Sequence, residues 1–180
     1  MTVSLVVATL GDSITEGTPG DTTWQHWAAL LHPELEFRVH GVNRQRTDQI
    51  AARLDDAVAG ADVLIVQGGI NDIAQGHSVE GAARHLRDMV QRGKALGLRV
   101  GLVNLLPWNN GWPDAEPKIR KLNALIDAIG SDEQVPVLPF HDTLEDPASP
   151  GRMKPEWVCD GDHPSVEGYR RLGELAFRPI

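Results

Sequence analysis

Apolar runs of strand length alternate along this chain with segments whose apolar residues recur every three or four positions. Residues 3–10 form an apolar run rich in β-branched side chains that stops at Gly11, and residues 62–67 form a second that stops at Gly68. Runs that are apolar throughout are typical of parallel strands covered on both faces. Three further strands are predicted at residues 35–40, 98–105 and 135–138.

Helical periodicity fills the intervals between the predicted strands. Helices are predicted to begin near Thr23, Thr47, Ser78 and Pro164, with one more around residues 119–129. The helix from Thr47 is expected to run unbroken to Gly60, and residues 139–161, which carry several prolines, are expected to be irregular. Pro136 lacks an amide hydrogen, which places the fifth strand at an edge of the sheet.

Strands that alternate with helices from end to end predict a parallel sheet between two layers of helices. The fold class is therefore α/β, a three-layer α/β/α sandwich with a five-stranded parallel sheet, and residues 1–180 are expected to form one domain. In such a sheet every strand points the same way, and ligands bind outside the carboxyl ends of the strands.

The residues that could carry chemistry all follow predicted strands, so the topology brings them to one edge of the sheet. In chain order they are Ser13, Gly41, Asn71, Trp108, Trp112, Asp160 and His163. A serine hydroxyl is a weak nucleophile that needs a neighbouring base, and an imidazole that titrates near neutrality can be that base. A carboxylate three residues before the histidine can orient the ring from a single turn.

Each of these residues also has an ordinary structural reading. The segment around Ser13 could be a strand-to-helix turn that bonds its own amides, Asn71 could cap a turn, and Gly41 could be a strand stop. Asp160 could be a surface carboxylate, as is expected of its neighbour Asp162. Their shared edge and chain order favour a catalytic site over these readings.

Three short motifs carry a family resemblance. Gly11-Asp12-Ser13, Gly69-x-Asn71-Asp72 and Asp160-x-x-His163 resemble, in that order, the blocks of the SGNH hydrolases, also called GDSL-type esterases and lipases. The resemblance implies a flavodoxin-like topology. It also implies Ser13 as nucleophile, His163 as base and Asp160 as the residue that orients the base.

For the oxyanion hole, the resemblance implies three donors: the backbone amides of Ser13 and Gly41 and the side-chain amide of Asn71. The second block departs from the family pattern. The family often has an asparagine two residues before the glycine and another glycine three residues after it, where this chain has Val39 and Arg44. The shape of this loop is therefore the part of the site that the sequence specifies least.

Composition excludes several other classes of function. Seventeen Lys and Arg against 25 Asp and Glu give a net charge of −8, which disfavours nucleic-acid binding. No apolar stretch approaches the length of a membrane span, and the start of the chain lacks a basic region typical of a signal peptide, so a cytoplasmic protein is expected. The histidines show no metal-site spacing, and neither a metal nor a cofactor is expected. The single cysteine, Cys159, is expected to be a buried thiol.

The expected activity is that of a serine esterase that hydrolyses short acyl or acetyl esters through an acyl-enzyme on Ser13. A thioesterase or a lysophospholipase on the same site, a non-catalytic binding domain, and a flavodoxin-like signalling or cofactor domain are alternatives. Trp108 and Trp112 could line an acyl pocket, stack on a sugar ring or pack their loop onto the body.

Overall fold

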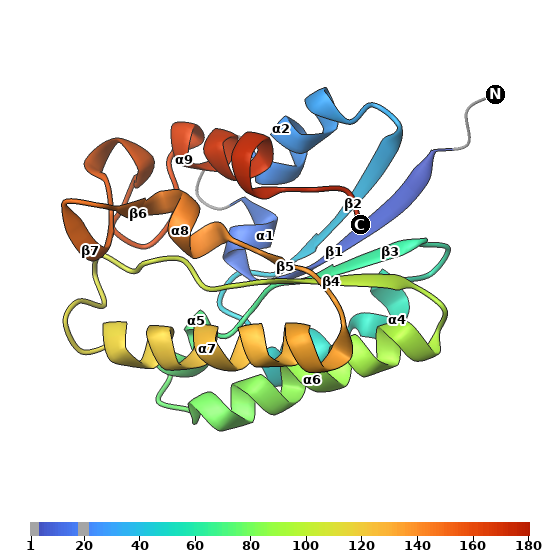
Figure 1. Cartoon of the computed structure of the whole chain (residues 1–180), viewed down its shortest axis with the longest axis horizontal. Coiled ribbons are helices and arrows are strands. Elements are labelled where there is room, and N and C mark those ends of the chain that lie inside the picture. The colour runs from blue at the N-terminus through green and yellow to red at the C-terminus, as the bar shows by residue number, and fades with distance from the viewer. Residues whose placement is uncertain (1–3, 18–21) are drawn as a thin grey trace.

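A computed structural model describes residues 4–17 and 22–180 and contains the predicted five-stranded parallel sheet (Figure 1). Residue 3, where the first strand was predicted to begin, lies outside the described residues. In spatial order the strands are β2 (Leu35–Gly41), β1 (Leu5–Gly11), β3 (Val63–Val66), β4 (Arg99–Val103) and β5 (Val137–Leu138). Every neighbouring pair is parallel, and β5 lies at the edge, as Pro136 predicted.

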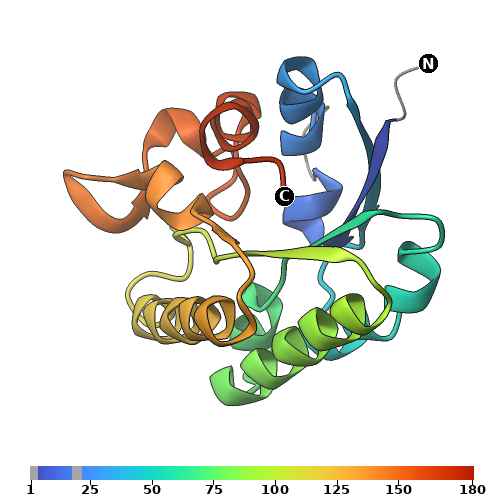
Figure 2. The ribbon, with the colours of Figure 1, turned by 45° about the vertical axis from the view of Figure 1, so that its right-hand side comes forward.

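Helices cover both faces of the sheet, which confirms the predicted three-layer sandwich (Figures 1 and 2). On one face lie α3 (Thr47–Ala51), α4 (Leu54–Ala57), α5 (Ile70–Ala74), α6 (Val79–Ala95) and α7 (Glu116–Glu133). On the other lie α1 (Ser13–Glu16), α2 (Trp24–Leu31), α8 (Phe140–Leu144), α9 (Val166–Arg171) and the π-helix η2 (Leu172–Ala176).

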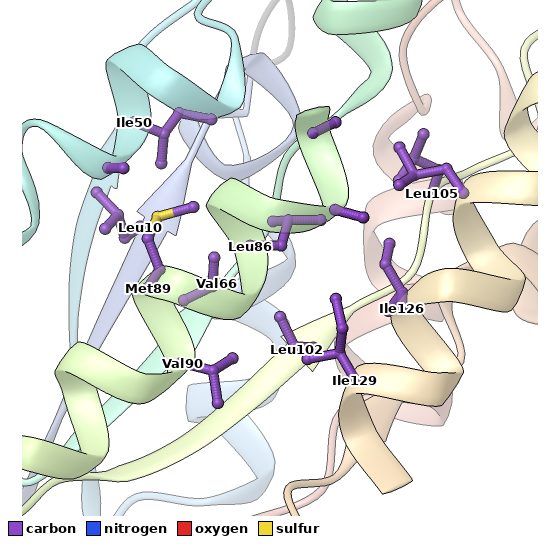
Figure 3. Close-up of a cluster of buried hydrophobic side chains, with 14 of the residues drawn as sticks. Leu10, Ile50, Val66, Leu86, Met89, Val90, Leu102, Leu105, Ile126 and Ile129 are labelled. Carbon is purple, nitrogen blue, oxygen red and sulfur yellow. The ribbon is translucent and has the colours of Figure 1, made fainter. Parts of the chain in front are cut away.

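Side-chain alternation along the central strand β3 divides the interior into two hydrophobic clusters. Leu64 and Val66 face the cluster beneath α6 and α7, which includes Leu86 and Ile126 (Figure 3). The alternate residues of the same strand, Val63 and Ile65, pack into the cluster that contains Trp24, Phe140 and Tyr169. All four residues of β3 are buried, as expected of a strand covered on both faces.

Two expectations about local structure were wrong. Residues 139–161 are not irregular, because they form α8, a two-stranded antiparallel hairpin of β6 (Glu145–Asp146) and β7 (Ser149–Met153), and the 3₁₀-helix η1 (Pro155–Trp157). The predicted helix from Thr47 to Gly60 is broken into α3 and α4 at residues 52–53. The Arg53 side chain lies at the carboxyl ends of β1 and β2, where it donates to the carbonyl oxygens of Gly11 and His40.

No helix in the described part of the chain has both the length and the apolarity that crossing a bilayer requires.

Candidate active site

Ser13 occupies the first position of α1, directly beyond the carboxyl end of β1. Asp12 is the N-cap of this helix, and its Oδ1 accepts a hydrogen bond of 3.0 Å from the amide of Ile14. Gln67, the residue after the adjacent strand β3, holds the same turn, since its Oε1 accepts from the Asp12 amide at 3.2 Å and from the Thr15 hydroxyl at 2.9 Å. Hydrogen bonds to Asp12 and to Gln67 therefore fix the turn that carries the candidate nucleophile.

A chain of hydrogen bonds links Ser13, His163 and Asp160. Ser13 Oγ lies 3.0 Å from His163 Nε2, and His163 Nδ1 lies 2.7 Å from Asp160 Oδ2. A carboxylate only accepts, so Nδ1 donates to Asp160 and the lone pair of Nε2 is left for the serine hydroxyl. This is the arrangement in which an imidazole can take a proton from a serine.

The carboxylate of Asp160 also organises the turn that carries the histidine. Its Oδ1 accepts hydrogen bonds from the backbone amides of Asp162 and His163, at 2.8 and 2.7 Å. Partial burial raises the pKa of Asp160, but the hydrogen bond from His163 and those from the two amides outweigh this effect and hold the pKa below its usual value. Asp160 is therefore an anion at neutral pH, as its predicted role requires.

A second carboxyl group lies beneath the site. Asp12 is fully buried, and this burial raises its pKa to about 6, despite hydrogen bonds from Ile14 and Gln67 that favour the charged form. Its Oδ2 lies 3.4 Å from Asn71 Nδ2. Asp12 thus contributes geometry to the site, as the N-cap of α1 and as a hydrogen-bond partner of Asn71.

Asn71 reaches the site from α5, just beyond the end of β3. Its Nδ2 donates to the carbonyl oxygen of Gln45 at 3.0 Å, and Asn71 lines the same cavity as Ser13 and His163. The preceding Gly69 has a φ of 122°, and a Cβ there would lie 2.6 Å from Leu122 Cδ2. Only glycine allows the chain to turn here, so the predicted proximity of Asn71 to Ser13 depends on Gly69.

The structure does not bring Gly41 to the cavity. Gly41 is the last residue of β2, paired with Gly11, and a Cβ on it would lie 2.2 Å from the backbone nitrogen of Glu16. Because Gly41 has no side chain, the end of β2 can pack directly against α1. The residues of this loop that line the cavity are Asn43 and Arg44.

The cavity that contains Ser13 and His163 has a volume of about 370 Å³. Much of its wall is apolar, from Ile14, Ile70, Val103, Leu105, Leu106, Trp108 and Phe140. Of the two tryptophans that could line an acyl pocket, stack on a sugar ring or pack their loop, Trp108 lies on the cavity wall and Trp112 does not. Trp112 is 42% exposed and packs against Gly151 on the β6–β7 hairpin, so its position fits the expectation that it packs a loop onto the body.

Asn110 is a site residue that sequence patterns did not single out. Its Nδ2 donates to the carbonyl oxygen of Asp160 and to Oδ1 of Asp162, at 3.0 and 2.8 Å. Trp108 Nε1 donates to the same Asp162 oxygen at 2.6 Å. The loop after β4 is thereby tied to the turn that carries the catalytic candidates. Asp162 is exposed, as expected, yet it joins these two loops.

The prediction that Cys159 is buried was wrong, because the residue is exposed. Its amide donates to the carbonyl oxygen of His163 across the base of the turn, so the backbone is held there while the thiol is not enclosed. Asp160, Asp162 and His163 bring potential metal-ligand atoms within 4.8 Å of one another, as do His141, Asp142 and Glu145. In the first set the Asp160 carboxylate is already engaged by His163 and two amides.

Comparison with known proteins agrees with this geometry. The model of the GDSL-like lipase/acylhydrolase family matches residues 9–171, which include Ser13, Asn71, Asp160 and His163. The chain belongs to this family. Family membership makes it a hydrolase of the acylhydrolase and esterase class. No curated protein matched the sequence.

Solved structures of GDSL proteins share the fold of this family member. A G-D-S-L family protein from Desulfitobacterium hafniense DCB-2 superposes with a TM-score of 0.85 at 22% identity, covering 95% of this chain and 97% of the other. A GDSL-like lipase from Bacteroides thetaiotaomicron VPI-5482 gives 0.81 at 23% identity, with 94% and 84% covered. Axe2-W215I, an acetyl xylan esterase from Geobacillus stearothermophilus, gives 0.76 at 18% identity, with 96% and 94% covered.

Proposed function

We propose that this GDSL family member is a serine esterase that hydrolyses carboxylic esters with short acyl groups through an acyl-enzyme on Ser13. The observation that carries the proposal is the hydrogen-bonded chain from Ser13 Oγ through His163 to Asp160, with heavy-atom distances of 3.0 and 2.7 Å. These distances lie within the range required of a nucleophile and its base.

In the first half of the reaction, Ser13 Oγ attacks the ester carbonyl carbon while His163 Nε2 takes the hydroxyl proton. The tetrahedral intermediate collapses by breaking the bond to the alcohol oxygen, which leaves with the proton from Nε2. Water then attacks the acyl-enzyme, giving its proton to Nε2, and the carboxylic acid is released as Ser13 regains its proton. Asp160 keeps the ring in the required tautomer and stabilises the imidazolium.

The proposal assigns two donors to the carbonyl oxygen of the ester as this oxygen gains charge. The Ser13 amide is in the first turn of α1, where backbone amides lack an intrahelical acceptor, and the Asn71 side-chain amide lies on the same cavity. One such donor is typically worth about 3–4 kcal/mol in the transition state. Gly41, the third predicted donor, is not part of this proposal because it does not line the cavity.

The size and wall of the cavity support a short acyl group. Its volume of about 370 Å³ lies near the lower limit of typical ligand pockets, which is roughly 300 Å³. The wall beside Ser13 is formed by apolar side chains that can accept a small hydrocarbon group, including Leu105, Leu106 and Phe140. The acetyl xylan esterase with the same fold is consistent with short acyl substrates.

The test is hydrolysis of p-nitrophenyl esters of increasing acyl length by the wild type, Ser13→Ala and Ser131→Ala. Ser131 is an exposed serine in α7 and serves as the matched control. We expect turnover to be greatest with acetyl to butyryl esters, to be lost in Ser13→Ala and to be retained in Ser131→Ala. An organophosphorus probe should add to Ser13, as read by mass spectrometry of the peptides. A wild type without turnover and without an adduct would refute the proposal and favour a binding domain.

A further inference from the structure

Arg44 stands out because it holds a backbone conformation that a residue with a side chain rarely adopts. Gln45 N donates to Val42 O at 3.3 Å, so residues 42–45 form a β-turn, and Arg44, its third residue, has a φ of 66°. Glycine is favoured at such a position. Among the described residues, the only other non-glycine residue with a positive φ is Gln134, which caps the end of α7.

Side chains that surround the site hold this turn in place. Gln75 Nε2 donates to the carbonyl oxygen of Arg44 at 2.9 Å, and Asn71 Nδ2 donates to that of Gln45 at 3.0 Å. Arg46 in turn donates to Gln75 Oε1 at 2.9 Å. Non-glycine residues in the left-handed region cost of order 1–3 kcal/mol and persist only where their surroundings fix them, most often at functional sites. Arg44 therefore lies on the cavity wall at an energetic cost to the fold.

The guanidinium of Arg44 is a cation that the described part of the chain leaves without a hydrogen bond or ion pair. Nearby arginines differ: Arg46 pairs with Asp48 at 3.0 Å, and Arg53 donates to the carbonyl oxygens of Gly11 and His40. The chain as a whole carries a net charge of −8. An exposed arginine on the wall of the cavity that contains Ser13, without a partner in residues 4–17 and 22–180, is thus available to a ligand.

The order of the strands separates this cation from the apolar part of the cavity. The Arg44 turn follows β2, Ser13 follows β1, Asn71 follows β3, and Leu105 and Trp108 follow β4. Strands lie about 4.8 Å apart. The sheet order therefore places the Arg44 turn on the β2 side of β1, whereas Leu105 and Trp108 follow a strand on the other side of β1.

The charged side chains on the cavity wall are divided in the same way. Asp162, the acidic residue on its wall, accepts from Trp108 Nε1 and so belongs to the apolar side. An ester whose carbonyl carbon is at Ser13 extends one arm to each side. A negatively charged arm is repelled by Asp162 and attracted by Arg44, and guanidinium groups recognise carboxylate, sulfate and phosphate through paired hydrogen bonds.

We propose that Arg44 binds an anionic group on one arm of the ester substrate, while the other, apolar arm lies against Leu105 and Trp108. The natural substrates are then esters that carry a carboxylate, sulfate or phosphate on either the acyl or the alcohol portion. This inference rests on the proposed esterase function and makes Arg44 a specificity-determining residue.

The test compares kcat/KM for two pairs of esters that differ in one charged group. Monoethyl glutarate against ethyl pentanoate places the anion on the acyl arm, and O-acetylglycolate against propyl acetate places it on the alcohol arm. For each pair, kcat/KM for the anionic ester is divided by kcat/KM for the neutral ester. This ratio is measured for the wild type, Arg44→Gln, Arg44→Lys and Arg99→Gln. Arg99 is the first residue of β4, at the amino end of the strands, whereas the site lies beyond their carboxyl ends, and its substitution controls for the loss of one positive charge.

We expect the ratio for one of the two pairs to fall about tenfold in Arg44→Gln, which corresponds to ~1.4 kcal/mol. In Arg99→Gln the ratio should stay within about twofold of wild type, because salt screening weakens the effect of distant charges. Arg44→Lys should retain part of the preference. Taking the ratio cancels any change in the common catalytic steps.

The outcomes separate the two proposals. Turnover of neutral esters with the same ratio in the wild type and in Arg44→Gln, for both pairs, would overturn the role of Arg44 and leave the esterase function standing. An equal fall in the ratio for Arg99→Gln would also overturn it, because a general charge effect would then account for the preference. Absence of turnover of every ester by the wild type would refute the esterase function and this inference with it.

Discussion

Ser13 Oγ and His163 Nε2 lie 3.0 Å apart although 150 residues separate them in the chain. Ser13 is held by β1 and by Gln67, which follows the adjacent strand β3. His163, by contrast, belongs to a turn between η1 and α9 that lies outside the sheet. The contact joins the first strand of the fold to one of its last turns. The proposed chemistry depends on both ends of this contact being fixed.

Asp160→Asn should lower kcat by about 10²–10⁴-fold. The asparagine oxygen can still accept from the amides of Asp162 and His163, but its NH₂ group would face His163 Nδ1, where a donor meets a donor. The ring would then favour the wrong tautomer. Steady-state kinetics on a p-nitrophenyl ester would measure the loss, with the exposed Asp56→Asn as the control, for which a change of less than about twofold is expected because salt screens distant charges. Equal losses in the two variants would mean that Asp160 has no special part in orienting the ring.

Asn71→Ala should lower kcat by about 10²–10³-fold with a much smaller change in KM, since an oxyanion donor acts mainly in the transition state. The side chain also bonds Gln45 O, so thermal unfolding and circular dichroism should accompany the kinetics. A folded variant in which KM rises and kcat stays the same would place Asn71 in substrate binding instead.

Asp12→Asn should stabilise the protein above pH 6. Burial raises the pKa of Asp12 to about 6, above its ordinary value of 3.8, so the folded state retains a proton that the unfolded state has lost between these values. The stability contributed by this group is present below pH 4 and is lost as the pH rises towards 6, a difference of up to about 3 kcal/mol.

Asparagine is neutral at every pH and can still cap α1 by accepting from Ile14. Urea unfolding at pH 4.5 and at pH 8 would measure the gain, which should be present mainly at the higher pH. The exposed Asp56→Asn is the control. A gain that is the same at both pH values would argue against a raised pKa for Asp12.

Arg44→Gly should raise the free energy of unfolding by up to about 1 kcal/mol, because the left-handed conformation costs a residue with a Cβ about 1–2 kcal/mol and the added freedom of glycine in the unfolded chain offsets part of this. Arg44→Ala keeps the Cβ and should show no such gain. Denaturant unfolding of both variants would measure the difference. A glycine variant less stable than the alanine variant would show that the turn does not strain the chain.

The parallel sheet and the edge position of its fifth strand could be predicted, because the first and third strands are apolar runs that stop at a glycine and Pro136 lacks an amide hydrogen. The residues 62–68 specify both the strand and its end without help from distant segments. The same reasoning placed Ser13, Asn71 and His163 at one edge, since parallel strands leave no choice of side. These are local patterns combined with one topological rule.

What could not be predicted depends on contacts made only after folding. The α8 helix and the β6–β7 hairpin bury Leu144 and Met153 against distant parts of the chain, and their prolines obscure any period in the sequence. Gly41 has the spacing of a strand stop and of a loop donor alike, and only its packing against Glu16 distinguishes them. Asn110 and Gln67 act by hydrogen-bonding backbone across loops, which leaves no periodic signal. Arg44, by contrast, could have been singled out as the residue that replaces an expected glycine.

The turn that carries His163 belongs to a layer with its own attachment to the sheet. Tyr169, Leu172 and Phe177 anchor that layer against Trp24, in a cluster separate from the one beneath α6 and α7. Partial opening of this outer layer would withdraw the imidazole and leave the strands paired. In rising denaturant, inactivation should therefore precede the loss of secondary structure, which would make enzymatic turnover a more sensitive reporter of native integrity than circular dichroism.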